Sequence, residues 1–202
     1  MGAGKKSALL IIIILVIDQV LKFWVKTHMQ IDDEIHLLGN RGMLHFIENN
    51  GMAFGMEIKA PGGKIMLSLF RIVAICGIGW FLRSLIIKKS NAGLILAVSA
   101  ILAGAIGNLI DSAFYGMIFS ESYTHTAILF PPGGGYSSFL QGRVVDMLYF
   151  PVINTHWPSW SPIHAGETFV FFRPIFNIAD SAITCGVLSI LIFQKRMFKG
   201  VE

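Results

Sequence analysis

Two aspartates stand in stretches of the chain that are otherwise apolar. Asp180 lies in F-N-I-A-D-S-A-I-T, residues 176–184, and Asp146 lies in G-R-V-V-D-M-L-Y-F, residues 142–150. Two carboxyl groups that meet in a low-dielectric site cannot both ionise cheaply, so one keeps its proton. The ionised group can then remove a proton from water, and the protonated group can protonate the leaving nitrogen of a peptide bond. Such a pair predicts hydrolysis without a nucleophilic serine or a metal.

Each aspartate also has a purely structural interpretation. Asp180 could be a carboxylate at the amino end of a helix, where the helix dipole favours negative charge. Asp146 could be an ordinary surface aspartate. These interpretations stay open at this point.

An asparagine precedes an aspartate by three residues at two places. Asn108 and Asp111 occur in N-L-I-D-S, and Asn177 and Asp180 occur in N-I-A-D-S. Residues three apart share one face of a helix. Gly104, just before the first pair, allows a neighbouring helix to approach closely. Each segment therefore presents an amide and a carboxyl group on one helical face.

Asp18 and Lys22 form a third polar pair, four residues apart in an apolar run. This spacing also places both side chains on one helical face. They could form an internal ion pair that lets the helix tolerate charge. Alternatively, the same pair could support a site at the outer membrane surface.

The composition indicates a membrane protein. Of the 202 residues, 54% are hydrophobic and 14% are charged, and the mean hydropathy is +0.66. These values exceed ordinary globular usage, and the length accommodates about four spans of roughly 20 residues. We expect one mainly α-helical membrane domain, residues 1–202, with spans at about 8–25, 65–87, 92–114 and 175–193.

The lysines and arginines orient these spans. Basic clusters precede the first span, link the second to the third, and follow the fourth, at residues 5–6, 88–89 and 195–199. Because basic loops stay in the cytoplasm, both termini are predicted to be cytoplasmic. The segments 27–64 and 115–174 then lie outside, and Asp146 and Asp180 can converge at the outer membrane face.

Other classes of site find little support in the sequence. The six histidines include no H-E-x-x-H motif, so we expect no metal and no cofactor. There is no basic patch of the kind that binds nucleic acid. Cys76 and Cys185 fall inside apolar runs, which predicts buried thiols and not a disulfide. In the first outer segment, alternation around M-L-H-F-I suggests short strands.

Five blocks, in order, carry a resemblance to a known family. They are D-Q-V-L-K (residues 18–22), N-N-G-M-A-F-G (49–55), G-A-I-G-N-L-I-D (104–111), V-V-D (144–146) and F-N-I-A-D-S-A-I (176–183). Together they resemble lipoprotein signal peptidase, the bacterial signal peptidase II family of aspartyl membrane proteases. The resemblance extends over nearly the whole chain.

The resemblance implies a four-span helical protein of the bacterial cytoplasmic (inner) membrane, with a small extracytoplasmic β-cradle and a short loop helix. The implied partners are membrane lipid and a diacylated prolipoprotein, cut just before its lipidated cysteine by a protein that works as a monomer. The implied catalytic dyad is Asp146 and Asp180. The implied substrate-binding or supporting residues are Asp18, Lys22, Asn49, Gly51, Gly104, Asn108, Asp111 and Asn177.

The chain departs from the family pattern in two ways. The family usually has an arginine after the aspartate of the third-span block, where this chain has Ser112. Arg143 is our candidate replacement in substrate binding, although it could be a plain loop cation. The stretch 118–141 is also inserted, either as a substrate lid or as a tolerated surface insertion.

Two further functions remain open from the residues alone. A small ion transporter could use the intramembrane carboxylates to bind or relay ions. A non-catalytic assembly or chaperone protein could use the asparagine–aspartate faces only to join its helices.

Overall fold

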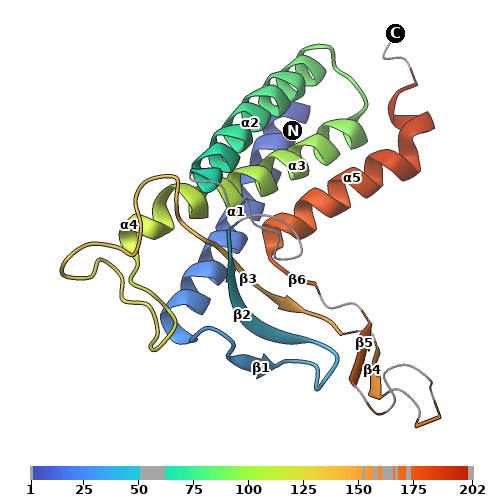
Figure 1. The fold of residues 1–202 in the computed structure, drawn as a ribbon. Helices are drawn as coiled ribbons and strands as arrows, with labels where there is room; N and C mark the ends of the chain where they lie inside the picture. Colours follow the sequence, from blue (N-terminus) through green and yellow to red (C-terminus); the bar gives the residue numbers. More distant parts are fainter. Residues whose placement is uncertain are drawn as a thin grey trace.

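Four helices of the chain are long and apolar enough to cross a membrane. The computed structural model describes residues 2–50, 62–151, 153–156, 159–160, 166, 168–171 and 174–199, and it places these helices beside one another (Figure 1). They are α1 (Ala3–His28), α2 (Gly63–Ile87), α3 (Ala92–Ile110) and α5 (Ile178–Met197). The prediction of four spans is confirmed.

The third span is longer than its apolar pattern predicts. A π-helical turn, η2 (Asp111–Tyr115), and a short helix, α4 (Gly116–Ile118), continue α3 without a break. The resemblance also implies a short loop helix, and α4 is the one short helix in the described part of the chain. Single π-helical turns inside helices are frequent at functional sites. This turn begins at Asp111, a predicted site residue.

The fourth span begins later than predicted. The apolar pattern predicts helix at Ile175 and Phe176, but these residues form a strand, β6. This strand pairs with Leu148 and Tyr149. The helix α5 starts only after Asn177, which caps it. Tertiary pairing therefore overrides the local apolar pattern at this boundary.

The third helix is the centre of the bundle. In its span, 56% of the residues are buried, whereas each of the other three spans has at most 17% buried. The helices α1, α2 and α5 all pack against α3, and their outward faces carry exposed apolar side chains such as Phe70, Val73 and Ile192. These faces have the character of a lipid-facing surface.

Glycines allow α3 and α5 to approach backbone to backbone. A Cβ atom on Gly104 would lie 2.2 Å from the carbonyl oxygen of Ala179, and one on Gly186 would lie 2.7 Å from that of Ala97. Small residues at such crossings are typical of membrane helix pairs. The contact fixes the start of α5 against α3.

A four-stranded antiparallel sheet lies at one end of the bundle (Figure 1). Its order is β1 (Glu34–His36), β2 (Met43–Asn49), β3 (Val144–Tyr149), β6 (Ile175–Phe176). A separate pair, β4 (Ile153–His156) and β5 (Thr168–Phe171), extends beyond it. In the register of β2 with β3, Asn49 is opposite Val144 and Ile47 is opposite Asp146. The expected small β-cradle is present.

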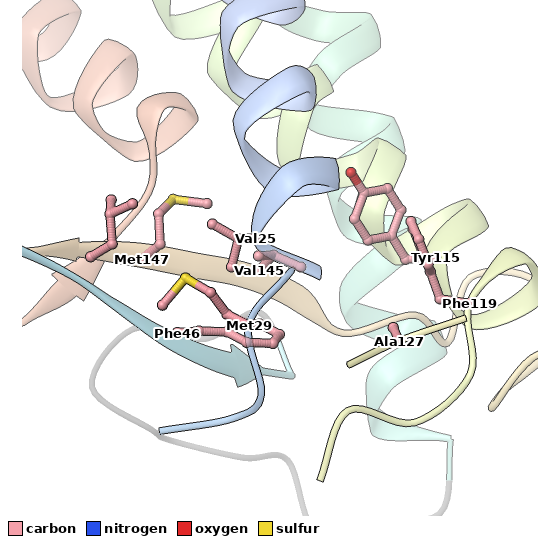
Figure 2. Packing of buried hydrophobic residues seen from close by; sticks show 9 residues of the cluster. Val25, Met29, Phe46, Tyr115, Phe119, Ala127, Val145 and Met147 are labelled. Atoms are coloured by element: carbon pink, nitrogen blue, oxygen red, sulfur yellow. The ribbon is translucent and has the colours of Figure 1, made fainter. Parts of the chain in front are cut away.

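An apolar core joins the sheet to the ends of α1 and α3. It includes Val25 and Met29 from the end of α1, Tyr115 from η2, and Val145 and Met147 from β3 (Figure 2). Successive side chains of a strand point to opposite faces. Since Val145 and Met147 face this core, the side chain between them, on residue 146, points the other way.

The inserted stretch 118–141 folds back onto the end of the third helix. Tyr136 N–H donates to Phe119 O (3.0 Å), Ser137 N–H donates to Gly116 O (2.8 Å), and Gly142 N–H donates to Ser112 O (2.8 Å). A Cβ on Gly135 would lie 2.1 Å from Gly116 O, so this return requires glycine. The insertion is thus built into the fold beside η2.

The opposite end of the bundle carries both termini (Figure 1). The exposed residues Lys5, Lys6, Lys88 and Lys89 lie at this end, as do Lys195 and Arg196. The prediction of buried thiols is wrong. Cys76 and Cys185 are free and exposed, because each falls on an outward face of its helix.

Candidate active site

The structure brings Asp146 and Asp180 into one cluster. Asp146 lies on β3 and is 2% exposed. Asp180 lies in the first turn of α5 and is partly exposed. Asn177 connects them, because its Nδ2 donates to Asp146 Oδ1 (2.7 Å) while its Oδ1 accepts from the Asp180 N–H (2.8 Å). The side chain of Asn177 thus joins the carboxyl group of Asp146 on β3 to the backbone of Asp180 at the start of α5.

A second amide links the same two groups from α3. Asn108 donates from Nδ2 to Asp180 Oδ1 (2.8 Å), and its Oδ1 accepts from Asn177 Nδ2 (3.0 Å). The chain of contacts therefore runs from Asp146 through Asn177 and Asn108 to Asp180. Each asparagine–aspartate motif contributes its asparagine to this network, and the second motif also contributes Asp180.

Asp180 has a structural role as well. It is the N3 residue of a capping box, in which its carboxylate accepts from the Asn177 N–H (3.4 Å) and Asn177 accepts from its N–H. Such a box satisfies two of the donors that a helix start leaves unpaired. The helix-end interpretation of Asp180 is therefore confirmed, and its carboxylate is also part of the network with Asn108.

The environment of Asp146 favours its protonated form. Burial raises the pKa of this carboxyl group well above its ordinary value, and the nearby negative charge of Asp180 raises it further. The charge of Lys22 and the hydrogen bond from Asn177 act in the opposite direction. Asn49, on the neighbouring strand β2, also donates from Nδ2 to Asp146 Oδ2.

Lys22 joins the two other predicted aspartates. Its Nζ lies 3.0 Å from Asp18, 2.8 Å from Asp111 and 3.1 Å from Asn108 Oδ1, and the side chain is fully buried. An ammonium group has three donors, and these three acceptors match them. Lys22 therefore holds α1 against α3 directly behind the network.

Asp18 and Asp111 position the elements that carry the dyad. Asp18 Oδ1 accepts from the Ala179 N–H at the start of α5 (2.9 Å). Asp111 Oδ2 accepts from the Val145 N–H on β3 (3.2 Å). The first contact holds the helix of Asp180, and the second holds the strand of Asp146.

Arg143 lies in a different group of charges. Its guanidinium contacts Glu121 (2.7 Å) and Glu48 (3.2 Å), and it lies over the ring of Tyr136. Lys26, buried at the end of α1, contacts Glu48 as well. These contacts tie the inserted stretch to α1 and the sheet. Gly51, the remaining predicted residue, lies outside the described residues.

Several polar residues of the site did not stand out in the sequence. Gln19 donates to Asp111 Oδ1 (3.0 Å), and its Oε1 accepts from the Tyr115 hydroxyl (3.2 Å). Arg71 and Lys64 of α2 both contact Ser112. A lone arginine in the apolar run F-R-I-V was the available signal for Arg71.

This arrangement is suited to acid–base chemistry. One carboxyl group is buried and favours its proton, its neighbour lies at a helix start and is partly exposed, and amides fix both. A small polytopic membrane protein with such a polar site at the end of its bundle is the class that the fold and the site define.

Comparisons with known proteins identify the family. A model of the family described as Signal peptidase (SPase) II matches residues 10–196. A lipoprotein signal peptidase from Porphyromonas gingivalis is 50% identical over 194 residues, covering 96% of this chain and 84% of that relative. One from Amoebophilus asiaticus is 40% identical over 185 residues, covering 90% of this chain and 73% of that relative. This chain belongs to the signal peptidase II family.

Solved structures agree on the fold. A bacterial membrane enzyme determined by the in meso method at 2.3 Å resolution superposes with a TM-score of 0.65 and 24% identity, covering 98% of this chain and 92% of that one. A second such structure, at 1.9 Å resolution, gives a TM-score of 0.63.

Membership of the family makes this chain a bacterial membrane protease that cleaves signal peptides from lipoproteins, so its substrate is a prolipoprotein. This favours the protease over the ion transporter and the assembly protein.

Proposed function

We propose that this protein is an aspartic-type endopeptidase that cuts diacylglyceryl-modified prolipoproteins just before the lipidated cysteine. The observation that carries the proposal is the placement of Asp146 and Asp180 in one network, linked through Asn177 and Asn108. Other predicted residues act as supports. Asp18, Lys22 and Asp111 hold the elements that carry the dyad, and Gly104 allows them to approach.

In the proposed reaction, Asp146 starts protonated and Asp180 starts ionised. Asp180 takes a proton from a water molecule, whose oxygen bonds to the carbonyl carbon of the scissile peptide. Asp146 then gives its proton to the leaving nitrogen as the carbon–nitrogen bond breaks. The new acid leaves with the hydroxyl group that came from water, and the proton on Asp180 passes to Asp146, which restores the starting state. The raised pKa of Asp146 supports this assignment of roles.

The surrounding amides suit an extended substrate backbone. A peptide strand in an apolar environment must have its N–H and C=O groups satisfied. Asn49, Asn108 and Asn177 place amide groups around the dyad, and each amide can both donate and accept. We also assign Gly51 a role in substrate binding, because a glycine permits close approach of a substrate backbone.

We propose the following placement in the cell. The basic ends of the helices lie in the cytoplasm, the sheet and the dyad face outward, and the protein resides in the cytoplasmic (inner) membrane as a monomer surrounded by lipid. The segregation of Lys5, Lys6, Lys88 and Lys89 to the end opposite the sheet supports this orientation. The scissile bond of an inserted prolipoprotein would then meet the site where water is accessible.

The test is an incubation of the purified protein with a diacylglyceryl-modified prolipoprotein peptide, with products identified by mass spectrometry. The same peptide with an unmodified cysteine serves as the matched control. We expect a single cut before the modified cysteine and little or no cut in the control. Efficient cleavage of the unmodified peptide, or no cleavage of either, would rule the proposal out.

A further inference from the structure

The second helix brings two cations to one hydroxyl group of the third span. Arg71 Nη1 lies 3.0 Å from Ser112 Oγ, and Lys64 Nζ lies 3.3 Å from the same atom. Ser112 donates its own hydroxyl proton to Asn108 O (3.1 Å), so its oxygen accepts from both cations. Ser112 directly follows Asp111, where the chain departs from its family's usual arginine.

Arg71 also reaches the network of the dyad. Its Nη1 lies 3.5 Å from Asn108 O, and Asn108 is the residue that donates to Asp180. The charges with which Arg71 interacts are those of Asp180, Asp111 and Asp146. The guanidinium therefore lies on the side of α2 that faces the site, whereas its neighbour Phe70 is 69% exposed on the outer side.

A cation at this depth in a membrane span needs a reason. Arg71 is eight residues into α2, about 12 Å along the helix axis from Gly63. Charged side chains within spans are costly, face the interior, and mostly serve function.

Arg71 also helps to balance the negative charge of the carboxylates around it. Within the described residues the cluster combines four aspartates and three cations, namely Asp18, Asp111, Asp146, Asp180, Lys22, Lys64 and Arg71. With every group in its ordinary charge state, the carboxylates exceed the cations by one. A single proton shared by the dyad makes the cluster neutral, which is the state that the proposed reaction starts from.

We propose that Arg71 is the substrate-binding arginine of this protein, with its guanidinium beside Ser112 placed to receive the carbonyl oxygens that flank the scissile bond. This inference rests on the proposed function. The planar guanidinium presents several donors in a fixed fork, which matches carbonyl acceptors better than an ammonium does. A serine at position 112 leaves the space that the guanidinium of Arg71 takes from the neighbouring helix.

Arg143 is the competing candidate from the sequence. Its guanidinium contacts Glu121 and Glu48, and its side chain belongs to the group that holds the inserted stretch. Since these carboxylates already neutralise it, we assign it to holding that stretch. Arg71 contacts the residue that bonds Asp180, and Arg143 does not share that contact in the described structure.

The experiment compares the cleavage kinetics of five proteins on the lipidated peptide across a range of pH. They are the wild type, Arg71→Ala, Arg71→Lys, the double variant Arg71→Ala/Ser112→Arg, and Arg83→Ala. Arg83 is an exposed arginine of the same helix and serves as the matched control. Thermal unfolding in detergent checks that each variant is folded.

We expect Arg71→Ala to raise KM by about tenfold or more, since a hydrogen bond to a charged group contributes about 1.5–3 kcal/mol. Arg71→Lys should recover part of this loss, and Ser112→Arg in the double variant should recover more. Removing the positive charge also favours protonation of both carboxyl groups of the dyad. The acidic and the alkaline half-maximum of kcat/KM should therefore both move up by about one unit in Arg71→Ala.

The outcomes separate the inference from the function on which it rests. If Arg71→Ala has the same kinetics as the wild type, the inference is overturned. Cleavage by the wild type would still support the proposed function. An equal fall in rate at every pH, with KM unchanged and no recovery in the double variant, would show a merely structural role. If Arg71→Ala does not fold, unchanged KM and pH profile in Arg71→Lys overturn the inference. Absence of cleavage by the wild type would contradict the proposed function itself.

Discussion

At the scale of residues, the site depends on buried charged side chains whose hydrogen-bond donors and acceptors have partners. Lys22 is the clearest case, because Asp18, Asp111 and Asn108 accept its three protons with both carboxylates inside the protein. Removing one partner of a buried ion pair leaves an uncompensated charge, which costs much more than the pair contributes.

Lys22→Met should therefore lower the free energy of unfolding by about 3–5 kcal/mol. Thermal or denaturant unfolding of the purified protein in detergent measures this change. Lys88→Met is the matched control, because Lys88 is exposed at the far end of the bundle. Equal stability of the two variants would show that Lys22 is not the support described here.

The raised pKa of Asp146 predicts how stability depends on pH. Because this pKa is higher in the folded protein than in the unfolded chain, stability from the protonated carboxyl is fully present below the unfolded value, about 3.9, and is lost as pH rises through the folded value. Asp146→Asn should not lose stability in this way as pH rises, because its amide stays neutral. The melting temperature of the wild type should fall relative to Asp146→Asn between pH 4 and pH 8. A constant difference over that range would contradict the assignment, and Asp32→Asn, at an exposed position, should follow the wild type.

The two aspartates that the structure brings into one network could be singled out from the sequence, and the contact of Arg71 with Ser112 could not. Asp146 and Asp180 each break an apolar run, and Asn108 and Asn177 repeat one spacing, so local pattern alone singles them out. The role of Arg71 depends on which face of α2 packs against α3. Lys64, Ser68 and Arg71 recur at helical spacing on one face of α2, but this pattern does not tell which helix the face packs against.

At the scale of elements, the start of α5 must lie against α3 for Asn108 to reach Asp180. Gly104 makes that possible, since a Cβ there would lie 2.2 Å from the carbonyl oxygen of Ala179. The block G-A-I-G predicted close helix approach, although the sequence did not tell which helix approaches. The start of α5 also could not be predicted from the sequence, because two apolar residues of the predicted span form the strand β6.

Gly104→Ala should force the two helices apart and cost about 1–3 kcal/mol of stability. The displaced start of α5 carries Asp180 with it, so cleavage should fall as well. Gly77→Ala in α2 is the matched control, because no atom lies within 4 Å of its new Cβ. Loss of stability by the control, or normal activity in Gly104→Ala, would contradict the role of this contact.

At the scale of the whole molecule, the bundle and the sheet are two supports for one site. The helices supply Asp180, Asn108 and the charges behind them, and the sheet supplies Asp146 on the face turned away from its own core. Four spans, a small sheet and the family follow from composition and five short blocks. The fold of the inserted stretch against η2 does not, since it depends on backbone contacts at Gly116 and Ser112 that no sequence pattern encodes.

The most direct test of the account is the cleavage rate of the lipidated peptide by Asp146→Asn and by Asp180→Asn, each compared with the wild type. Both asparagines keep the size of the side chain, and in the second variant an oxygen remains to accept at the helix cap, so both proteins should stay folded. The account predicts that each variant loses cleavage by about 10²–10⁴-fold, because general acid and general base catalysis each contribute about that much. Substantial turnover by either folded variant would contradict the dyad.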